Sequence, residues 1–155
     1  MESVESALVA LGLQLPAIAA PGGNYLPYVR WGDLLFLAGV ISTRNGQVIT
    51  GTVGADKTVE DGYQAALACT LAQLASIKQA LGTLDKVQRI ISVNGYVNSV
   101  PGFSESPQVI NGASDLLAKI YGDRGLHARA AIGVSGLPRN ALVEVQMVVG
   151  VKVEG

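Results

Sequence analysis

The chain has 155 residues, of which 49% are hydrophobic and 15% are charged, and its formal net charge is −1. This length suits one domain with a core of its own, but the charged fraction is well below the roughly 25% of an average soluble domain, so we expect further copies of the chain to cover part of the apolar surface. The net charge argues against a nucleic-acid partner, because binding to phosphates normally requires a basic face.

Other broad classes are disfavoured by the order of the residues. The apolar stretches are interrupted well before the roughly 18 residues that a membrane span needs, so no membrane partner is expected. The acidic start, Met1 to Ser6, does not resemble a signal peptide. A single cysteine, Cys69, excludes an internal disulfide and accords with a cytoplasmic location. One histidine and one cysteine are too few for a zinc site built by this chain alone, and we expect neither a metal nor a cofactor.

The first third of the chain predicts a short helix followed by strands. Apolar residues at helical spacing predict a helix over residues 3–12 that ends at Gly12. We expect residues 1–20 to form this helix and a connector, and residues 21–155 to form a single main domain. Strands are predicted over 28–42, with a tight turn at Gly32, and Asn45-Gly46 predicts a hairpin.

The rest of the chain alternates helices and strands. Thr58 to Asp61 resembles a capping box and predicts a helix that ends at Gly82. A strand over 86–98 is followed by a second helix, which begins at Ser106-Pro107 and ends at Gly122. Two strands, over about 128–135 and 142–151, complete the chain. This order predicts an α+β fold: one mixed sheet with two helices on one face.

The last two strands carry two charged residues, Arg129 and Glu144, among small and apolar neighbours. A charge in apolar surroundings is costly unless it is paired or functional. If residues 136–141 close a hairpin, alternation places Arg129 and Glu144 on one face, and the opposite face, which includes Ile132 and Val143, is expected to carry the helices. Gly133, rather than Arg129, then lies opposite Glu144.

That hairpin separates the two charges by about 13 Å at roughly 3.3 Å per residue, so we expect no ion pair between them within one chain. Each needs another partner: a ligand, a neighbouring subunit or water. Two interpretations remain open from the residues alone. Either the two charges serve a functional site, or Arg129 is bound by backbone carbonyls at an interface and Glu144 is solvated. His127 is expected to be an ordinary loop residue, and Cys69 a buried, inert thiol.

Several segments resemble the YjgF/RidA family (endoribonuclease L-PSP-like) in the right order. Ala128-Arg129, then Leu137-Pro138-Arg139-Asn140 and Val143-Glu144-Val145, are similar to its C-terminal signature. Gly23-Asn24-Tyr25 resembles its Gly-Pro-Tyr segment, and the strand Leu35 to Ile41, which contains Gly39, resembles its first long strand. Val109-Ile110-Asn111 resembles the segment that opens its second helix. The resemblance covers about residues 21–151 and marks a divergent member with an added N-terminal helix.

This resemblance implies a chorismate-mutase-like fold and a homotrimer with clefts between subunits. It further implies a deaminase that hydrolyses a small 2-imino acid to a 2-oxo acid and ammonia, without a cofactor. Arg129 is then expected to bind the carboxylate, and Glu144 to position or activate water. Tyr25 is expected to close the cleft from a neighbouring chain, Asn111 to offer a polar contact, and Gly39 to let the backbone approach the ligand.

The sequence departs from the family pattern beside the arginine. Ala131 stands where the family has a reactive cysteine, and Gly133 where it has a glutamate. This leaves an alternative: a non-catalytic trimer of the same fold that binds a small carboxylic, imino or oxo acid. A ribonuclease or translation-inhibitor role, also attached to the family's name, is disfavoured because the chain lacks a run of Lys or Arg.

Overall fold

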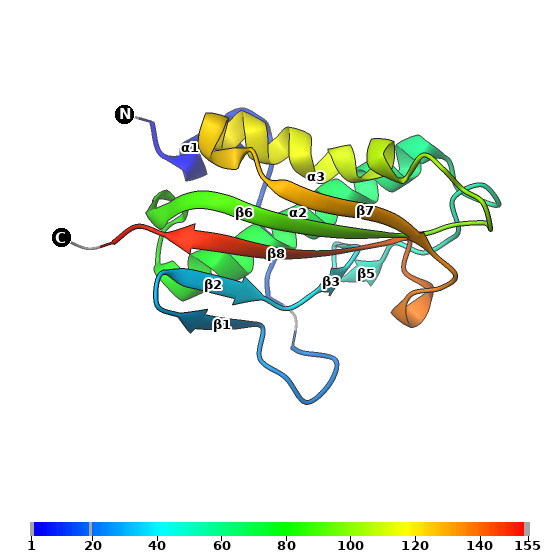
Figure 1. Ribbon diagram of the computed structural model, residues 1–155, viewed down its shortest axis with the longest axis horizontal. Coiled ribbons are helices and arrows are strands. Elements are labelled where there is room, and N and C mark those ends of the chain that lie inside the picture. Colours follow the sequence, from blue (N-terminus) through cyan, green and yellow to red (C-terminus); the bar gives the residue numbers. More distant parts are fainter. Residues whose placement is uncertain (1, 19, 154–155) are drawn as a thin grey trace.

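One mixed sheet, covered on one face by two long helices, forms the body of the protein (Figure 1). The computed structural model describes residues 2–18 and 20–153. The elements in chain order are α1 (Val4–Ala10), β1 (Tyr28–Trp31), β2 (Leu34–Leu37), β3 (Val40–Ile41), β4 (Thr43–Arg44), β5 (Gln47–Val48), α2 (Val59–Leu81), β6 (Val87–Asn98), α3 (Ser106–Tyr121), β7 (Ala128–Val134) and β8 (Val143–Val151), with short 3-10 turns η1 (Leu84–Lys86), η2 (Gly122–Gly125) and η3 (Pro138–Asn140). The predicted α+β class, with two helices on one face, is confirmed.

The strand order is β1-β2-β8-β6-β7, with β3 also paired to β8. β6 and β7 are parallel, whereas the other pairs of this sheet are antiparallel. β4 and β5 form the hairpin predicted at Asn45-Gly46, as a separate two-stranded sheet.

The predicted hairpin between the last two strands is wrong. β6 lies between β7 and β8 and pairs with both of them. The reason lies in the connection through α3: a strand that returns after a helical crossover lies parallel to the strand before it, so β7 takes one edge of β6. The other edge of this 12-residue strand is then free for β8.

Local capping signals define both long helices. At the start of α2, the Thr58 side chain accepts a hydrogen bond from the backbone N–H of Asp61, and the Asp61 carboxylate accepts one from the backbone N–H of Thr58. Hydrogen bonding of the Asp61 carboxylate to the Thr58 backbone N–H, and then to the Thr58 side chain, lowers the pKa of Asp61. Gly82, in the left-handed conformation, ends α2. α3 begins at Ser106, with Pro107 in its first turn, as predicted.

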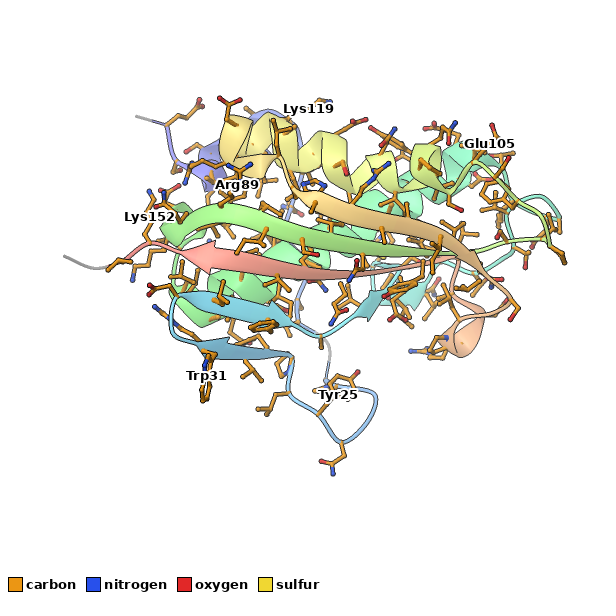
Figure 2. The ribbon with its side chains drawn as sticks, viewed as in Figure 1. Tyr25, Trp31, Arg89, Glu105, Lys119 and Lys152 are labelled. Atoms are coloured by element: carbon orange, nitrogen blue, oxygen red, sulfur yellow. The ribbon has the colours of Figure 1, made fainter. Side chains whose placement is uncertain are left out.

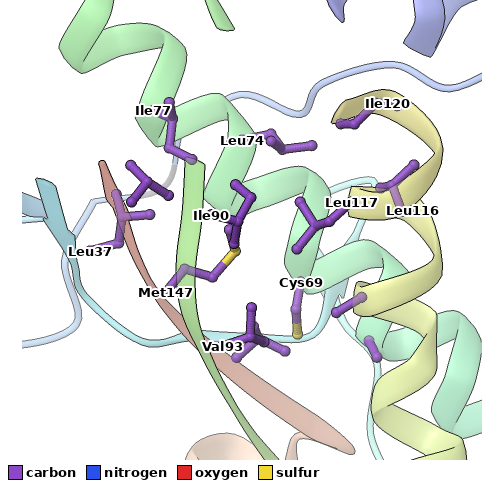
Figure 3. Packing of buried hydrophobic residues seen from close by; sticks show 14 of the residues in the cluster. Leu37, Cys69, Leu74, Ile77, Ile90, Val93, Leu116, Leu117, Ile120 and Met147 are labelled. Atoms are coloured by element: carbon purple, nitrogen blue, oxygen red, sulfur yellow. The ribbon is translucent and has the colours of Figure 1, made fainter. Parts of the chain in front are cut away.

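The core lies between these helices and the sheet (Figure 3). Cys69 of α2 is fully buried in it, as predicted, and burial raises the pKa of its thiol above the ordinary value. Alternate residues of β8 also face this core: Val143, Val145, Met147 and Val149. None of the helices in the described part of the chain is long and apolar enough to cross a membrane.

The sheet face away from the helices, which we name the open face, carries exposed apolar side chains. Trp31, drawn at the sheet edge in Figure 2, is 78% exposed. Ile132 of β7 is 49% exposed, so the prediction that it faces the helices is wrong. Its strand pairs with β6 in parallel, and the register puts Ile132 in one row with Tyr96 and Glu144. The other large exposed apolar residues of this face are Val29, Leu34, Phe36 and Ile91.

The N-terminal helix α1 is attached to the turn that follows α2. Val4 and Leu8 are buried. The carboxylate of Glu5 accepts hydrogen bonds from the Thr83 hydroxyl and from the backbone N–H of Leu84. These contacts fix α1 to the side of the domain, beside α3 and η1.

Candidate functional site

Arg129 projects from the edge strand β7 towards α3. Its register partner on β6 is Val93, which is buried beneath the helices, so the arginine leaves the sheet on the helix side. Nη1 donates to Oδ1 of Asn111 at 2.8 Å and to Oγ of Ser114 at 3.0 Å. Nη2 donates to the carbonyl oxygen of Pro107 at 3.1 Å. One strand and one helix thus fix the orientation of the guanidinium.

These three bonds leave part of the guanidinium available. A guanidinium has five N–H donors, and within residues 2–18 and 20–153 three of those on Arg129 have acceptors. The two that remain are Nε–H and one N–H of Nη2. Two donors on one planar group match the two oxygens of a carboxylate, which arginine binds in a bidentate manner. The arrangement therefore suits an anion of that shape.

A second tier of polar groups supports Arg129. Nδ1 of His127 lies 2.6 Å from the carbonyl oxygen of Gly125, and Nε2 lies 2.8 Å from Oγ of Ser114. Since a carbonyl only accepts, Nδ1 carries the proton, and Nε2 accepts from the Ser114 hydroxyl. Burial, together with the charge of Arg129, lowers the pKa of His127. The histidine is therefore a neutral acceptor that orients Ser114, not the ordinary loop residue expected.

Sequence reasoning passed over Ser114, although a signal for it was present. Ser114 follows Asn111 by three residues on a predicted helix, and this spacing places both on one helical face. The Pro107 carbonyl, by contrast, has no signature in the sequence. It accepts a hydrogen bond from Arg129 only because the first turn of α3 lies beside β7 in the fold.

Glu144 lies on the open face. Its neighbours along β8, Val143 and Val145, are buried under the helices, and its register partners are Ile41 and Tyr96. Burial raises the pKa of this half-buried carboxyl above its ordinary value. Within the described residues, no hydrogen bond or ion pair binds its carboxylate. A carboxyl in this setting is suited to exchange protons nearer neutral pH than an ordinary glutamate.

The prediction that Arg129 and Glu144 share a face is wrong. Arg129 belongs to the row of Val93 and Met147, which are buried on the helix side, whereas Glu144 belongs to the row of Tyr96 on the open face. The error follows from the hairpin predicted between β7 and β8. Because β6 lies between these two strands, the pairing of β7 with β6 and the pairing of β8 with β6 each set their own register. The absence of an ion pair between them within the chain still holds.

The Glu144 carboxylate lies against a bulge at Gly39. Between the pairs Phe36–Val148 and Val40–Val145, three residues of one strand oppose two of the other. Gln73, buried on α2, binds this bulge through Nε2, which donates to the carbonyls of Ala38 at 2.8 Å and of Val145 at 3.1 Å. The bulge lets Gly39 approach the glutamate, so the Glu144 carboxylate lies beside this backbone.

The remaining predicted residues are far apart within one chain. Tyr25 is 51% exposed, and its hydroxyl accepts a hydrogen bond from the backbone N–H of Gly22. It lies in the loop before β1, which projects beyond that edge of the sheet (Figure 2). Arg129 lies on β7, the opposite edge. Within one chain, Asn111 therefore contacts Arg129, and Gly39 lies beside Glu144, but Tyr25 lies near neither pair.

Small residues follow Arg129 on the helix side of β7. Ala131 pairs with Gly95, and Gly133 with the buried Val97, so both continue the face of Arg129. Neither offers a titratable group. Among the described residues, no group of three or more His, Cys, Asp or Glu side chains is arranged to hold a metal ion.

Comparison with known proteins places this arrangement in a family. Residues 5–151 match the family described as "YjgF/chorismate_mutase-like, putative endoribonuclease". The chain is 45% identical over 148 residues to protein TCP17 of Trypanosoma cruzi, a match that covers 94% of this chain and 92% of the relative. It is 24% identical over 139 residues to the 2-iminobutanoate/2-iminopropanoate deaminase of Dermatophagoides farinae, with 88% and 93% covered.

Solved structures agree with the sequence matches. The protein Atu1372 of unknown function from Agrobacterium tumefaciens superposes with a TM-score of 0.90 at 42% identity, covering 97% of this chain and 93% of that one. A "putative endoribonuclease" from Shewanella oneidensis MR-1 superposes with a TM-score of 0.93 at 38% identity, covering 97% and 100%. The chain therefore belongs to the YjgF/RidA family.

Proposed function

We propose that this protein is a small-molecule imine or enamine deaminase, which hydrolyses 2-imino acids to 2-oxo acids and ammonia. The observation that carries the proposal is the pre-oriented guanidinium of Arg129, which Asn111, Ser114 and Pro107 fix and which keeps two N–H donors for a carboxylate. A 24% identical relative named for deamination of 2-iminobutanoate and 2-iminopropanoate adds support.

The chemistry needs few groups. Arg129 binds the carboxylate, and a water molecule adds to the imine carbon while Glu144 takes up one of the water's protons. Glu144 passes this proton to the imine nitrogen, which gives the carbinolamine. Glu144 then takes the hydroxyl proton of the carbinolamine and passes it to the amine nitrogen. The C–N bond breaks, ammonia leaves, and the water oxygen becomes the 2-oxo group. The raised pKa of Glu144 suits a group that both takes up and returns a proton.

We place this reaction between subunits of a homotrimer. Arg129 and Glu144 point to opposite faces of one sheet, so a cleft that contains both draws them from two chains. Tyr25, at the opposite sheet edge from Arg129, is proposed to close the cleft of a neighbour. The exposed apolar side chains of the open face, such as Trp31 and Phe36, support burial against further copies. We also propose a cytoplasmic location, in keeping with the buried, unpaired Cys69.

The second candidate is a trimer that binds a small carboxylic acid without converting it. Ala131 and Gly133, the next residues on the face of Arg129, carry no group able to transfer a proton. In that case the guanidinium would still bind the acid, and Glu144 would have no part in chemistry. The two candidates differ in turnover, not in affinity.

The decisive experiment measures ammonia release from freshly generated 2-iminobutanoate. We expect the wild-type protein to accelerate it, and Arg129→Ala to lower kcat/KM by about 10- to 100-fold, because a charge-assisted pair is lost. Arg139→Ala, which removes an exposed arginine of the η3 turn, is the matched control and should retain activity. If the wild type binds 2-oxobutanoate without accelerating hydrolysis, the binding protein is the correct function. RNA cleavage that requires Arg129 would instead support a ribonuclease.

A further inference from the structure

We propose that the acid bound by Arg129 carries an oxygen on its side chain, and that the hydroxyls of Ser99 and Ser106 bind this oxygen. The inference rests on the proposed function in one respect: it takes Arg129 as the carboxylate anchor. It adds the class of substrate, namely short 2-imino or 2-oxo acids whose side chain ends in a hydroxyl or another oxygen.

The first observation is that both serines are buried yet lack partners. Ser99 is 8% exposed and Ser106 is 4% exposed. Within the described residues, neither hydroxyl forms a hydrogen bond. Oε1 of Gln73 is the one side-chain atom of the described residues that is both enclosed and without a partner, so the two serine hydroxyls still reach solvent. Both hydroxyls are thus shielded by the fold yet open to a bound molecule, and a ligand oxygen would give them a hydrogen-bond partner.

The second observation places both hydroxyls beside one point of β7. A Cβ built on Gly133 would lie 2.5 Å from Oγ of Ser99 and 3.7 Å from Oγ of Ser106. Gly133 follows Arg129 by four residues and so shares its face of the strand. The serine hydroxyls therefore point at the helix side of β7, where the guanidinium also lies.

The first turn of α3 links the arginine to the serines. Ser106 is the first residue of this helix, and the carbonyl of the next residue, Pro107, accepts a hydrogen bond from Nη2 of Arg129. On the strand, Ala131 lies between Arg129 and Gly133, and its side chain is a single methyl group. A short acid held by its carboxylate at Arg129 can therefore extend towards Ser106.

The character of this site favours an acceptor oxygen. The side chain of Glu105, the residue that caps α3, makes no hydrogen bond to the N–H groups of the first turn. Pro107 has no N–H, and the N–H of Val109 donates to the Glu105 carbonyl. The N–H groups of Ser106 and Gln108, with their partial positive charge, and the two hydroxyls together supply donors. An alkyl group placed there would accept a hydrogen bond from none of these donors.

The test compares two acids of equal size, 3-hydroxypyruvate and 2-oxobutanoate, by titration calorimetry on the full-length protein. We expect the wild type to bind 3-hydroxypyruvate about 5- to 10-fold more tightly, as one added hydrogen bond predicts. Ser99→Ala and Ser106→Ala should each bring the ratio of the two affinities close to 1. The affinity of each variant for 2-oxobutanoate should stay within about twofold of the wild-type value. Ser104→Ala, in the exposed loop just before α3, is the matched control. Oxaloacetate, as a third ligand, distinguishes a carboxylate oxygen from a hydroxyl.

Each result decides the question. Equal binding of the two acids by the wild type, with dependence on Arg129, would overturn the serine subsite and leave the proposed function intact. If Ser106→Ala weakens both acids equally, with an unchanged unfolding temperature, the serine has no selective role and the inference is also wrong. If no acid binds to either the wild type or Arg129→Ala, the anchor itself is absent, and the proposed function fails with it.

Discussion

The carboxylate of Glu144 lies over the backbone of Gly39, so close that a Cβ built on Gly39 would be 2.5 Å from Oε2. The Gly39 backbone does not have a positive φ, so an alanine there is allowed by its own conformation. What glycine provides at this position is space for the glutamate. The relationship links a β-bulge, bound by Gln73, to the Glu144 carboxyl on the open face.

Gly39→Ala is therefore expected to displace the Glu144 carboxylate while the fold is kept, because the clash is with the end of a flexible side chain. Imine hydrolysis should fall by at least about tenfold if Glu144 serves the water, since a misplaced catalytic group is costly. The measurement is kcat/KM together with the unfolding temperature. Unchanged kcat/KM in a folded variant would show that the position of Glu144 does not matter.

Glu144→Gln is expected to raise the unfolding temperature at neutral pH. Burial raises the pKa of Glu144 in the folded chain above its ordinary value of 4.5, so the folded state holds this proton more tightly than the unfolded state does. The wild type therefore loses stability as the pH rises from about 4.5 through the folded pKa, and the glutamine variant does not. Thermal unfolding of both proteins from pH 4 to pH 8 checks this: the gap should open with rising pH. A gap that is constant across this range would contradict the raised pKa.

Ser114→Ala should weaken the binding of a 2-oxo acid by about 5- to 10-fold, because Nη1 of Arg129 loses one of its two acceptors. A double-mutant cycle with Arg129→Ala isolates this effect. In the Arg129→Ala background, Ser114→Ala should change the residual affinity little. An equal loss in both backgrounds would mean that Ser114 acts through the fold and not through the guanidinium.

Gly112→Ala should destabilise the protein by about 3 kcal/mol, a cost of the order expected for overpacking. Gly112 lies in α3 where the helix meets α2, and a Cβ there would overlap the carbonyl oxygen of Tyr63, which belongs to rigid backbone. Gly136→Ala is the matched control, since a Cβ at Gly136 meets no atom within 4 Å. Denaturant unfolding of both variants gives the comparison. Similar stabilities would mean that α2 and α3 are able to separate at little cost.

Much of the fold could be predicted from the sequence because its signals are local. The reciprocal bonds of Thr58 and Asp61 and the left-handed Gly82 depend on residues next to one another, and they set the ends of α2 without reference to the rest of the chain. The same is true of Pro107 at the start of α3 and of the hairpin at Asn45-Gly46. The family resemblance around Arg129 and Glu144 was equally available, since it consists of residue order alone.

The sequence by itself thus determined the elements, the family and the identity of the candidate anchor, Arg129. Only the tertiary structure decided which strands pair with one another. β7 joins β6 in parallel after the α3 crossover, and β8 joins the other side of β6, so Arg129 and Glu144 lie on opposite faces. Strand pairing depends on contacts between residues far apart in the chain, and alternation along one strand does not reveal the register of its neighbour. For the same reason, only the folded chain placed Ser99 and Ser106 beside Gly133.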